Sequence, residues 1–423
     1  MSAGLPLRLV RALAVDVRPL RTVAFRRLWL GQGVILVGSQ MTVVAVPVQV
    51  YDITHRSLYV GLTSLVALVP LVVCGLLGGA IADAVDRRIL LLVTGGALAV
   101  VSAGLWAQAL LPGGGSISLL WALVAVQSAL VAVNSPARSA VIPRLVSAEQ
   151  VPAANALNQI VTNTGVVAGP LLAGVIIGQV GLAWTYLVDA GSFFVALYTL
   201  LRLPPLPPER NGETGRASVL EGLRFLAGRR ILLMTFLVDI NAMVFGWPRA
   251  LFPELAEVRF GGPGALGWLF AAPAIGALVA ALFSGWLGRV NRQGLTVLVS
   301  VSLWGLAIAA FGVAGTLPTA VFCLALAGAA DMVSSVFRTS MLQLAAPDAM
   351  RGRLQGVFIV VVTGGPRLGD LRAGGVSAVS SPAFSLVSGG IACVLGAVLL
   401  AMAVPAFARY RARGPDPEPG AVA

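Results

Sequence analysis

Long uncharged apolar stretches recur along this chain and limit it to one architecture, a bundle of membrane-spanning helices. A helix needs about 20 apolar residues to cross the ~30 Å hydrocarbon layer. The backbone of such a segment must be hydrogen-bonded within the protein, and the strands of a membrane barrel would alternate apolar with polar residues. Only 11% of the residues are charged, whereas soluble domains carry roughly 25%. We therefore expect an all-α membrane protein.

The apolar stretches predict twelve transmembrane helices. They are expected at residues 29–51, 58–82, 89–111, 117–139, 157–179, 182–202, 231–253, 264–288, 295–314, 318–340, 354–380 and 384–407.

The basic residues predict the orientation of these spans. The chain contains no lysine, and 24 of its 29 arginines fall in segments on the N-terminal side of the membrane, whereas the opposite loops hold only Arg56 and Arg259. Cytoplasmic loops carry the excess of basic residues in membrane proteins. Both termini are therefore expected in the cytoplasm, in a multi-pass protein of the inner (cytoplasmic) membrane. The net charge of +12 is interpreted as a topology signal beside membrane lipid, not as a nucleic-acid interface.

The longest polar interval separates six spans from six. It begins with the proline-rich sequence LPPLPPERNGETG, and its second part has apolar residues near helical spacing, which indicates a short interfacial helix. The expected organisation is a cytoplasmic N-terminal segment (1–28), two six-helix bundles (29–202 and 231–408), a cytoplasmic linker with the interfacial helix (203–230) and a cytoplasmic tail (409–423).

The two halves also resemble each other. Arg138-Ser139 matches Arg338-Thr339 at an offset of 200 residues, and at the same offset five positions of the fifth span are identical to positions between Gly365 and Gly374. Internal repeats are typical of secondary transporters, whose binding site lies at the repeat interface near the midplane. The repeat predicts that the stretch Phe358 to Ser380 is the eleventh span and not a loop.

A charged loop between the second and third spans reads GGAIADAVDRR. It resembles the loop of the major facilitator superfamily, Gly-x-x-x-Asp-Arg-x-Gly-Arg-Arg/Lys, although Ala84 replaces the first Arg and Asp86 the second Gly. In that family the loop is thought to latch the cytoplasmic side shut, whereas charges that only mark topology are the alternative. The residues assigned to the latch are Gly79, Asp83, Asp86, Arg87, Arg88, Arg138 and Arg338.

The fifth span reads GVVAGPLLAG and is similar to the antiporter motif of the same superfamily. The matching residues are Gly165, Gly169, Pro170 and Gly174. The resemblance implies export in exchange for protons, and close packing of small residues is the alternative. Over nearly the whole chain the sequence looks like the enterobactin-exporter branch of the superfamily. This resemblance implies a fold of two pseudo-symmetric six-helix bundles.

Ionisable residues inside predicted spans are costly and are usually functional. The candidates for substrate binding or proton coupling are Asp189, Asp239, Asp331, Arg367, Asp370 and Arg372. Arg367 and Asp370 are three residues apart and are expected to pair. The remaining positive charge is expected to face a water-filled cavity or a carboxylate of another span, with Asp239 and Asp331 as candidates. Ion pairs that only hold the bundle together are the alternative.

The resulting prediction is a secondary active exporter and not an enzyme. Its expected partners are protons, membrane lipid and a small molecule, such as a siderophore or a similar amphipathic anion. A multidrug (for example macrolide) efflux pump, a proton-coupled nutrient importer and a membrane enzyme acting on lipid-linked substrates are the alternatives. No cofactor or metal is expected, because the three cysteines lie in separate spans and His55 is the single histidine.

Overall fold

The computed structural model describes residues 16–202, 224–226, 228–345 and 348–411, with side chains throughout except at 76–84, 140, 345, 348–357 and 359–360. Every regular element in these ranges is a helix. Most of the expected interfacial helix and of the linker lies outside the described residues, and residues 224–226, which are described, are helical. The first part of the N-terminal segment and most of the tail also lie outside them.

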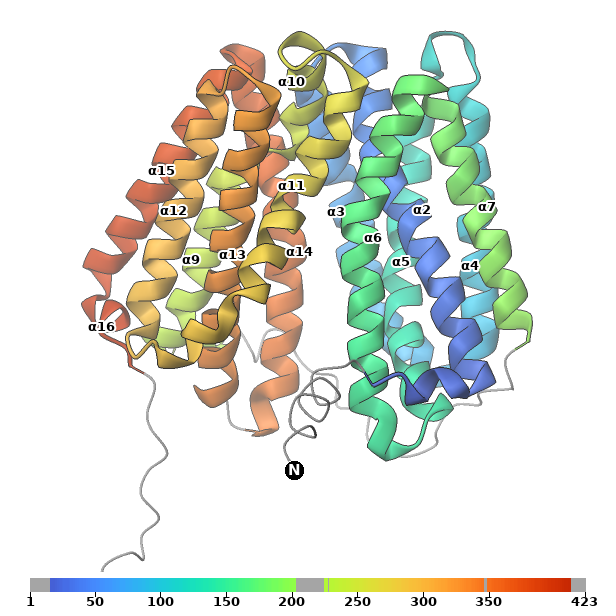
Figure 1. Ribbon diagram of the computed structural model, residues 1–423, viewed down its shortest axis with the longest axis horizontal. Coiled ribbons are helices and arrows are strands. Elements are labelled where there is room, and N and C mark those ends of the chain that lie inside the picture. The colour runs from blue at the N-terminus through green and yellow to red at the C-terminus, as the bar shows by residue number, and fades with distance from the viewer. Residues whose placement is uncertain (1–15, 203–223, 227, 346–347, 412–423) are drawn as a thin grey trace, which may run out of the picture. The chain divides into compact units, whose positions relative to one another are not determined.

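Eleven helices of the described chain are long and apolar enough to cross a membrane, and they match eleven of the twelve expected spans (Figure 1). In chain order they are α2 (Val23–Thr54), α3 (Ser57–Ala84), α4 (Arg87–Ala109), α5 (Ile117–Leu145), α6 (Val151–Gln179), α7 (Leu182–Leu201), α9 with α10 (Arg230–Gly246 and Phe252–Val258), α11 (Pro263–Leu282), α12 (Gln293–Val313), α13 (Leu317–Ala345) and α15 (Pro382–Ala403).

Helix α14 (Asp348–Val379) occupies the position of the remaining expected span, 354–380. Its uninterrupted course confirms that this charged stretch is a helix and not a loop. The glycines serve close packing: a side chain at Gly369 would lie 2.6 Å from the Cβ of Trp247, at the end of α9. Small residues of this kind let membrane helices approach each other.

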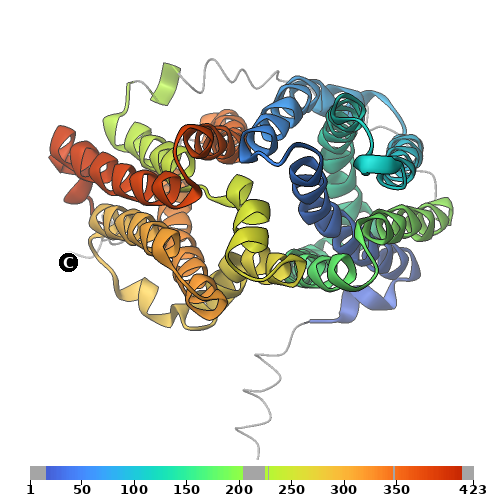
Figure 2. The same ribbon diagram turned by 90° about the horizontal axis from the view of Figure 1, so that it is seen from above.

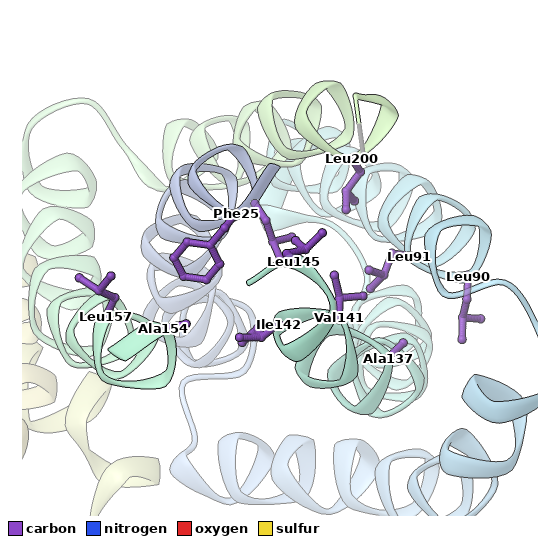
Figure 3. Packing of buried hydrophobic residues seen from close by; sticks show 11 residues of the cluster. Phe25, Leu90, Leu91, Ala137, Val141, Ile142, Leu145, Ala154, Leu157 and Leu200 are labelled. Carbon is purple, nitrogen blue, oxygen red and sulfur yellow. The ribbon is translucent and has the colours of Figure 1, made fainter. Parts of the chain in front are cut away.

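The chain divides into two compact units. The first unit holds residues 1–53 and 69–214, and an apolar core joins its helices α2 and α4–α7 at one end, as Figure 3 shows. The core side chains come from Phe25, Leu28, Leu90, Leu91, Ala137, Val141, Ile142, Leu145, Ala154, Leu157 and Leu200.

The second unit holds residues 54–68 and 215–423, so the first part of α3 belongs to it. Helices α12 and α15 lie side by side in both views (Figures 1 and 2). A side chain at Gly305 of α12 would lie 2.7 Å from the carbonyl oxygen of Gly390 of α15, so only glycine permits this approach. A short helix, α16 (Pro405–Ala408), follows α15.

The seventh span is not the continuous helix that was expected over residues 231–253. Helix α9 ends at Gly246, Trp247 is extended, and a short turn of 3-10 helix, η4 (Arg249–Leu251), leads into α10. Pro248 explains the break, because the residue before a proline is disfavoured in the helical conformation and proline itself donates no backbone hydrogen bond. The indole of Trp247 stacks on that of Trp304 of α12, with ring centroids 5.9 Å apart.

Candidate functional site

Three charged side chains of the second unit form a cluster of ion pairs. Arg338 of α13 forms an ion pair with Asp239 of α9 and a second one with Asp331, two turns earlier on the same face of α13, where Nη2 and Oδ1 lie 3.5 Å apart. Asp239 and Arg338 are almost completely enclosed, whereas the Asp331 side chain is 37% exposed. Arg338, a residue assigned to the cytoplasmic latch, is the shared partner of these two carboxylates. We call Asp239, Asp331 and Arg338 the acidic cluster.

The charges of α14 do not pair in the expected way. Arg367 Nη1 donates to the carbonyl of Thr363 at 2.7 Å, and both terminal nitrogens of Arg372 lie 3.3 Å from the carbonyl of Ser385. The expected pair of Arg367 with Asp370 is therefore wrong. Asp239 and Asp331, the candidate partners of the remaining positive charge, both pair with Arg338 of α13 and not with an arginine of α14.

Asp370 instead accepts a hydrogen bond from the backbone at the break in the seventh span. Its Oδ1 accepts from the backbone N–H of Ala250 at 2.9 Å, and its Oδ2 accepts from the Ser64 hydroxyl at 2.8 Å. The break leaves backbone donors without intrahelical acceptors, and such donors must be satisfied inside a membrane. A buried carboxylate that accepts from them is therefore a structural element of the broken helix. Ser64 lies on α3, and Ser57 of the same helix donates a hydrogen bond to Glu254 of α10.

Arg249 was missed by the sequence analysis. Its guanidinium lies 4.9 Å from the ring centroid of Trp247 and 5.9 Å from that of Phe270. The arginine count contained the signal. The 24 arginines that were expected in the cytoplasm and the two that were expected in the outer loops leave three of the 29, which are Arg249, Arg367 and Arg372.

The first unit contains a buried carboxylate of a different kind. Asp189 of α7 is fully buried, and its Oδ2 accepts from Thr42 of α2 at 2.7 Å and from Ser102 of α4 at 2.8 Å. Its Oδ1 has no hydrogen-bond partner. One turn earlier, Tyr186 donates to Gln49 at 2.8 Å. Among the described residues, Asp189 is thus hydrogen-bonded by two hydroxyl groups and by no cationic side chain.

The predicted latch is described only in part. Gly79 and Asp83 lie in α3, and their side chains are outside the described ones. Asp86 is the N-cap of α4, because its Oδ1 accepts from the backbone N–H groups of Arg88 at 2.8 Å and of Ile89 at 3.4 Å. The Arg88 side chain donates to the carbonyl of Leu201 at the end of α7.

Arg138, another latch arginine of the first unit, is hydrogen-bonded within its own helix. Arg138 of α5 donates through Nε to Asn134 at 3.2 Å, and Asn134 in turn donates to Thr94 of α4. Arg87, a third arginine assigned to the latch, is the first residue of α4.

Substitution of Asp86 by alanine is expected to destabilise the protein by about 1 kcal/mol, the usual contribution of an N-cap. Asp86→Asn keeps an acceptor for the same two amides and should preserve the melting temperature. The thermal unfolding of both variants in detergent measures this difference. Equal melting temperatures for the wild type and Asp86→Ala would contradict a capping role.

The antiporter-like residues of α6 pack against α2. A side chain at Gly165 would lie 3.0 Å from the Cβ of Leu36, and one at Gly169 would lie 3.0 Å from the carbonyl oxygen of Val37. Pro170 and Gly174 are buried in the same helix. Close helix packing is therefore one role of this motif.

The described residues contain no group of three or more metal-ligating side chains. Cys74, Cys323 and Cys393 are free thiols.

Known proteins resemble this chain over nearly its full length. The family model described as transmembrane secretion effector matches residues 14–419. The enterobactin exporter EntS of Shigella boydii serotype 18 is 32% identical over 394 residues, which cover 93% of this chain and 94% of that protein. EntS of Escherichia coli O81 matches with the same identity and coverage.

Solved structures of transporters share the fold. The nucleoside transporter NupG superposes with a TM-score of 0.73 at 14% identity, over 92% of this chain and 99% of that one. A bacterial homologue of the iron transporter ferroportin gives a TM-score of 0.67 at 16% identity, over 91% and 98%. The family match and the relatives establish that the chain belongs to the transmembrane secretion effector family and is a multi-pass membrane transporter of the major facilitator superfamily, not an enzyme.

Proposed function

We propose that this protein is a secondary active exporter that moves a siderophore, or a similar amphipathic anionic small molecule, out of the cytoplasm in exchange for protons. The observation that carries the proposal is the 32% identity to the enterobactin exporters over 93% of the chain. The antiporter-like motif of α6 supports the direction of transport. Transport would proceed by alternating access of two six-helix bundles, with α14 as the eleventh of twelve spans and both termini in the cytoplasm.

The acidic cluster is proposed as the proton-coupling site. With both carboxylates ionised, Asp239, Asp331 and Arg338 carry one net negative charge, and a single bound proton makes the cluster neutral. A net charge inside the membrane costs several kcal/mol, so the enclosed cluster favours the protonated state and water access favours release. Asp331 is the more exposed carboxylate, and it is therefore the proposed carrier of this proton.

Other charged residues have supporting roles in this proposal. Asp189, in the first unit, is a further carboxylate that is proposed to bind a proton. Its described hydrogen bonds come from two hydroxyl groups and not from a cation, and the protonated carboxyl group is neutral. Arg367 and Arg372 each use donors on backbone carbonyls and keep a positive charge that favours an anionic substrate. Gly79, Asp83 and the arginines beside them retain the proposed role of a cytoplasmic latch.

Transport into inside-out membrane vesicles tests the proposed function. Enterobactin should accumulate when a pH gradient is imposed, acidic inside, and accumulation should stop when an ionophore collapses the gradient. Vesicles without the protein give the background. Accumulation of a macrolide in place of enterobactin would identify a drug efflux pump, and gradient-driven movement in the opposite direction would identify an importer.

A further inference from the structure

The break in the seventh span presents an arginine whose described contacts are with aromatic rings. Arg249 is the first residue of η4, directly after Trp247-Pro248. Its guanidinium lies over the rings of Trp247 and Phe270. A guanidinium on an aromatic face is stabilised by the electrostatic field of the ring, and its N–H donors at the edge of the plane remain available.

Arg249 differs in this respect from the other arginines within the spans of the second unit. Arg338 has two carboxylates, and Arg367 and Arg372 donate to backbone carbonyls. Among the described residues, no carboxylate oxygen lies within 4.0 Å of the Arg249 nitrogens, the distance that defines an ion pair. Asp370, the acid beside it, is hydrogen-bonded to Ala250 and Ser64 instead.

The backbone at Arg249 is fixed on both sides. Pro248 precedes it with a restricted backbone angle. Asp370 holds the N–H of Ala250, the residue that follows. The side chain is only partly exposed, and its guanidinium packs against two aromatic rings, which limit its movement. An arginine fixed in this way loses little conformational entropy on binding a ligand.

We infer that Arg249 is an anion-binding residue of the substrate site and that it recognises a planar pair of oxygens, as in a carboxylate or a catecholate. The rigid fork of guanidinium donors fits such a pair of oxygens in a bidentate manner. Trp247 and Phe270 orient the fork, and Asp370 acts as a positioning residue through Ala250. This inference rests on the proposed export of an anionic small molecule and names the group that binds it.

Binding to the purified full-length protein in lipid nanodiscs tests this assignment. The probes are enterobactin, whose catechol hydroxyls ionise, and enterobactin with all of these hydroxyls methylated. Arg249→Gln should weaken the binding of enterobactin about tenfold or more, since charge-assisted hydrogen bonds are lost, and should leave the binding of the methylated probe unchanged. Arg249→Lys keeps the charge but not the fork, and intermediate binding is expected.

Arg202→Gln is the matched control, because Arg202 also stacks on an aromatic ring, with 5.3 Å to the Tyr198 centroid, but is exposed at the end of α7. It should bind both probes like the wild type. Thermal unfolding shows whether each variant is folded. If Arg249→Gln does not fold, the binding of enterobactin by Arg249→Lys decides whether Arg249 is the anion-binding residue.

The outcomes separate the inference from the proposed function. If folded Arg249→Gln and Arg249→Lys bind enterobactin like the wild type, Arg249 is not the anion-binding residue, although the protein remains an exporter of that compound. An equal loss for both probes would likewise overturn the assignment, because it would indicate a change in the shape of the site. If the wild type binds neither probe, the proposed substrate class fails.

Discussion

Substitution of Asp239 by asparagine is expected to abolish proton-driven export and to leave substrate binding largely intact. Arg338 would then retain Asp331 as its single carboxylate, and this pair is neutral without a proton. Protonation of Asp331 would then leave Arg338 with an unpaired positive charge inside the membrane, which is costly, so the cluster would stay deprotonated and the gradient would not drive transport. Gradient-driven accumulation in inside-out vesicles should fall to that of vesicles without the protein.

Two controls separate lost coupling from lost folding. Exchange of labelled for unlabelled substrate across the membrane needs no gradient and should continue in Asp239→Asn. Glu257→Gln removes an exposed carboxylate of α10 and should transport normally. Undiminished pH-dependent export by Asp239→Asn would remove this residue from the coupling mechanism.

Substitution of Asp370 by alanine is expected to destabilise the second unit. The change leaves the Ala250 amide and the Ser64 hydroxyl without their acceptor. The Ala250 amide is buried, and an unpaired buried donor costs about 1–3 kcal/mol. We expect a clearly lower melting temperature in detergent and a parallel loss of export. An unchanged melting temperature would contradict the role of Asp370 in holding the broken helix.

Asp370→Asn distinguishes a positioning role from a role in coupling. Its side-chain oxygen can still accept from Ala250, and its amide can donate to the hydroxyl oxygen of Ser64. Near-normal stability and transport are therefore expected. Stable protein that no longer responds to a pH gradient would instead place Asp370 in the coupling step.

The sequence alone predicts the elements whose signal is local. Uninterrupted apolar length is enough to locate eleven spans, and the repeat identifies Phe358 to Ser380 as helical despite its three charges. The seven-residue spacing of Asp331 and Arg338 is two turns of helix, which places them on one face, and the structure joins them.

The partners across helices could not be predicted. Asp239 meets Arg338 from a different helix, and no spacing rule relates two residues so far apart in the chain. Asp370 and Arg367 satisfy the local rule for a pair, but the break at Pro248 exposes an amide that competes for the same carboxylate. The role of Asp86 was also missed. Asp86 stands where the superfamily loop has a glycine, but in this structure its side chain caps the N-terminus of α4.

The most direct test of the central claim is the movement of protons that substrate causes. Purified protein is reconstituted into liposomes that contain a pH-sensitive dye, and enterobactin is added outside without an imposed gradient. Antiport predicts that protons leave the lumen as enterobactin enters, so the lumen becomes alkaline, and that Asp239→Asn liposomes give no change. Entry of enterobactin without proton movement, or with acidification of the lumen, would contradict proton antiport.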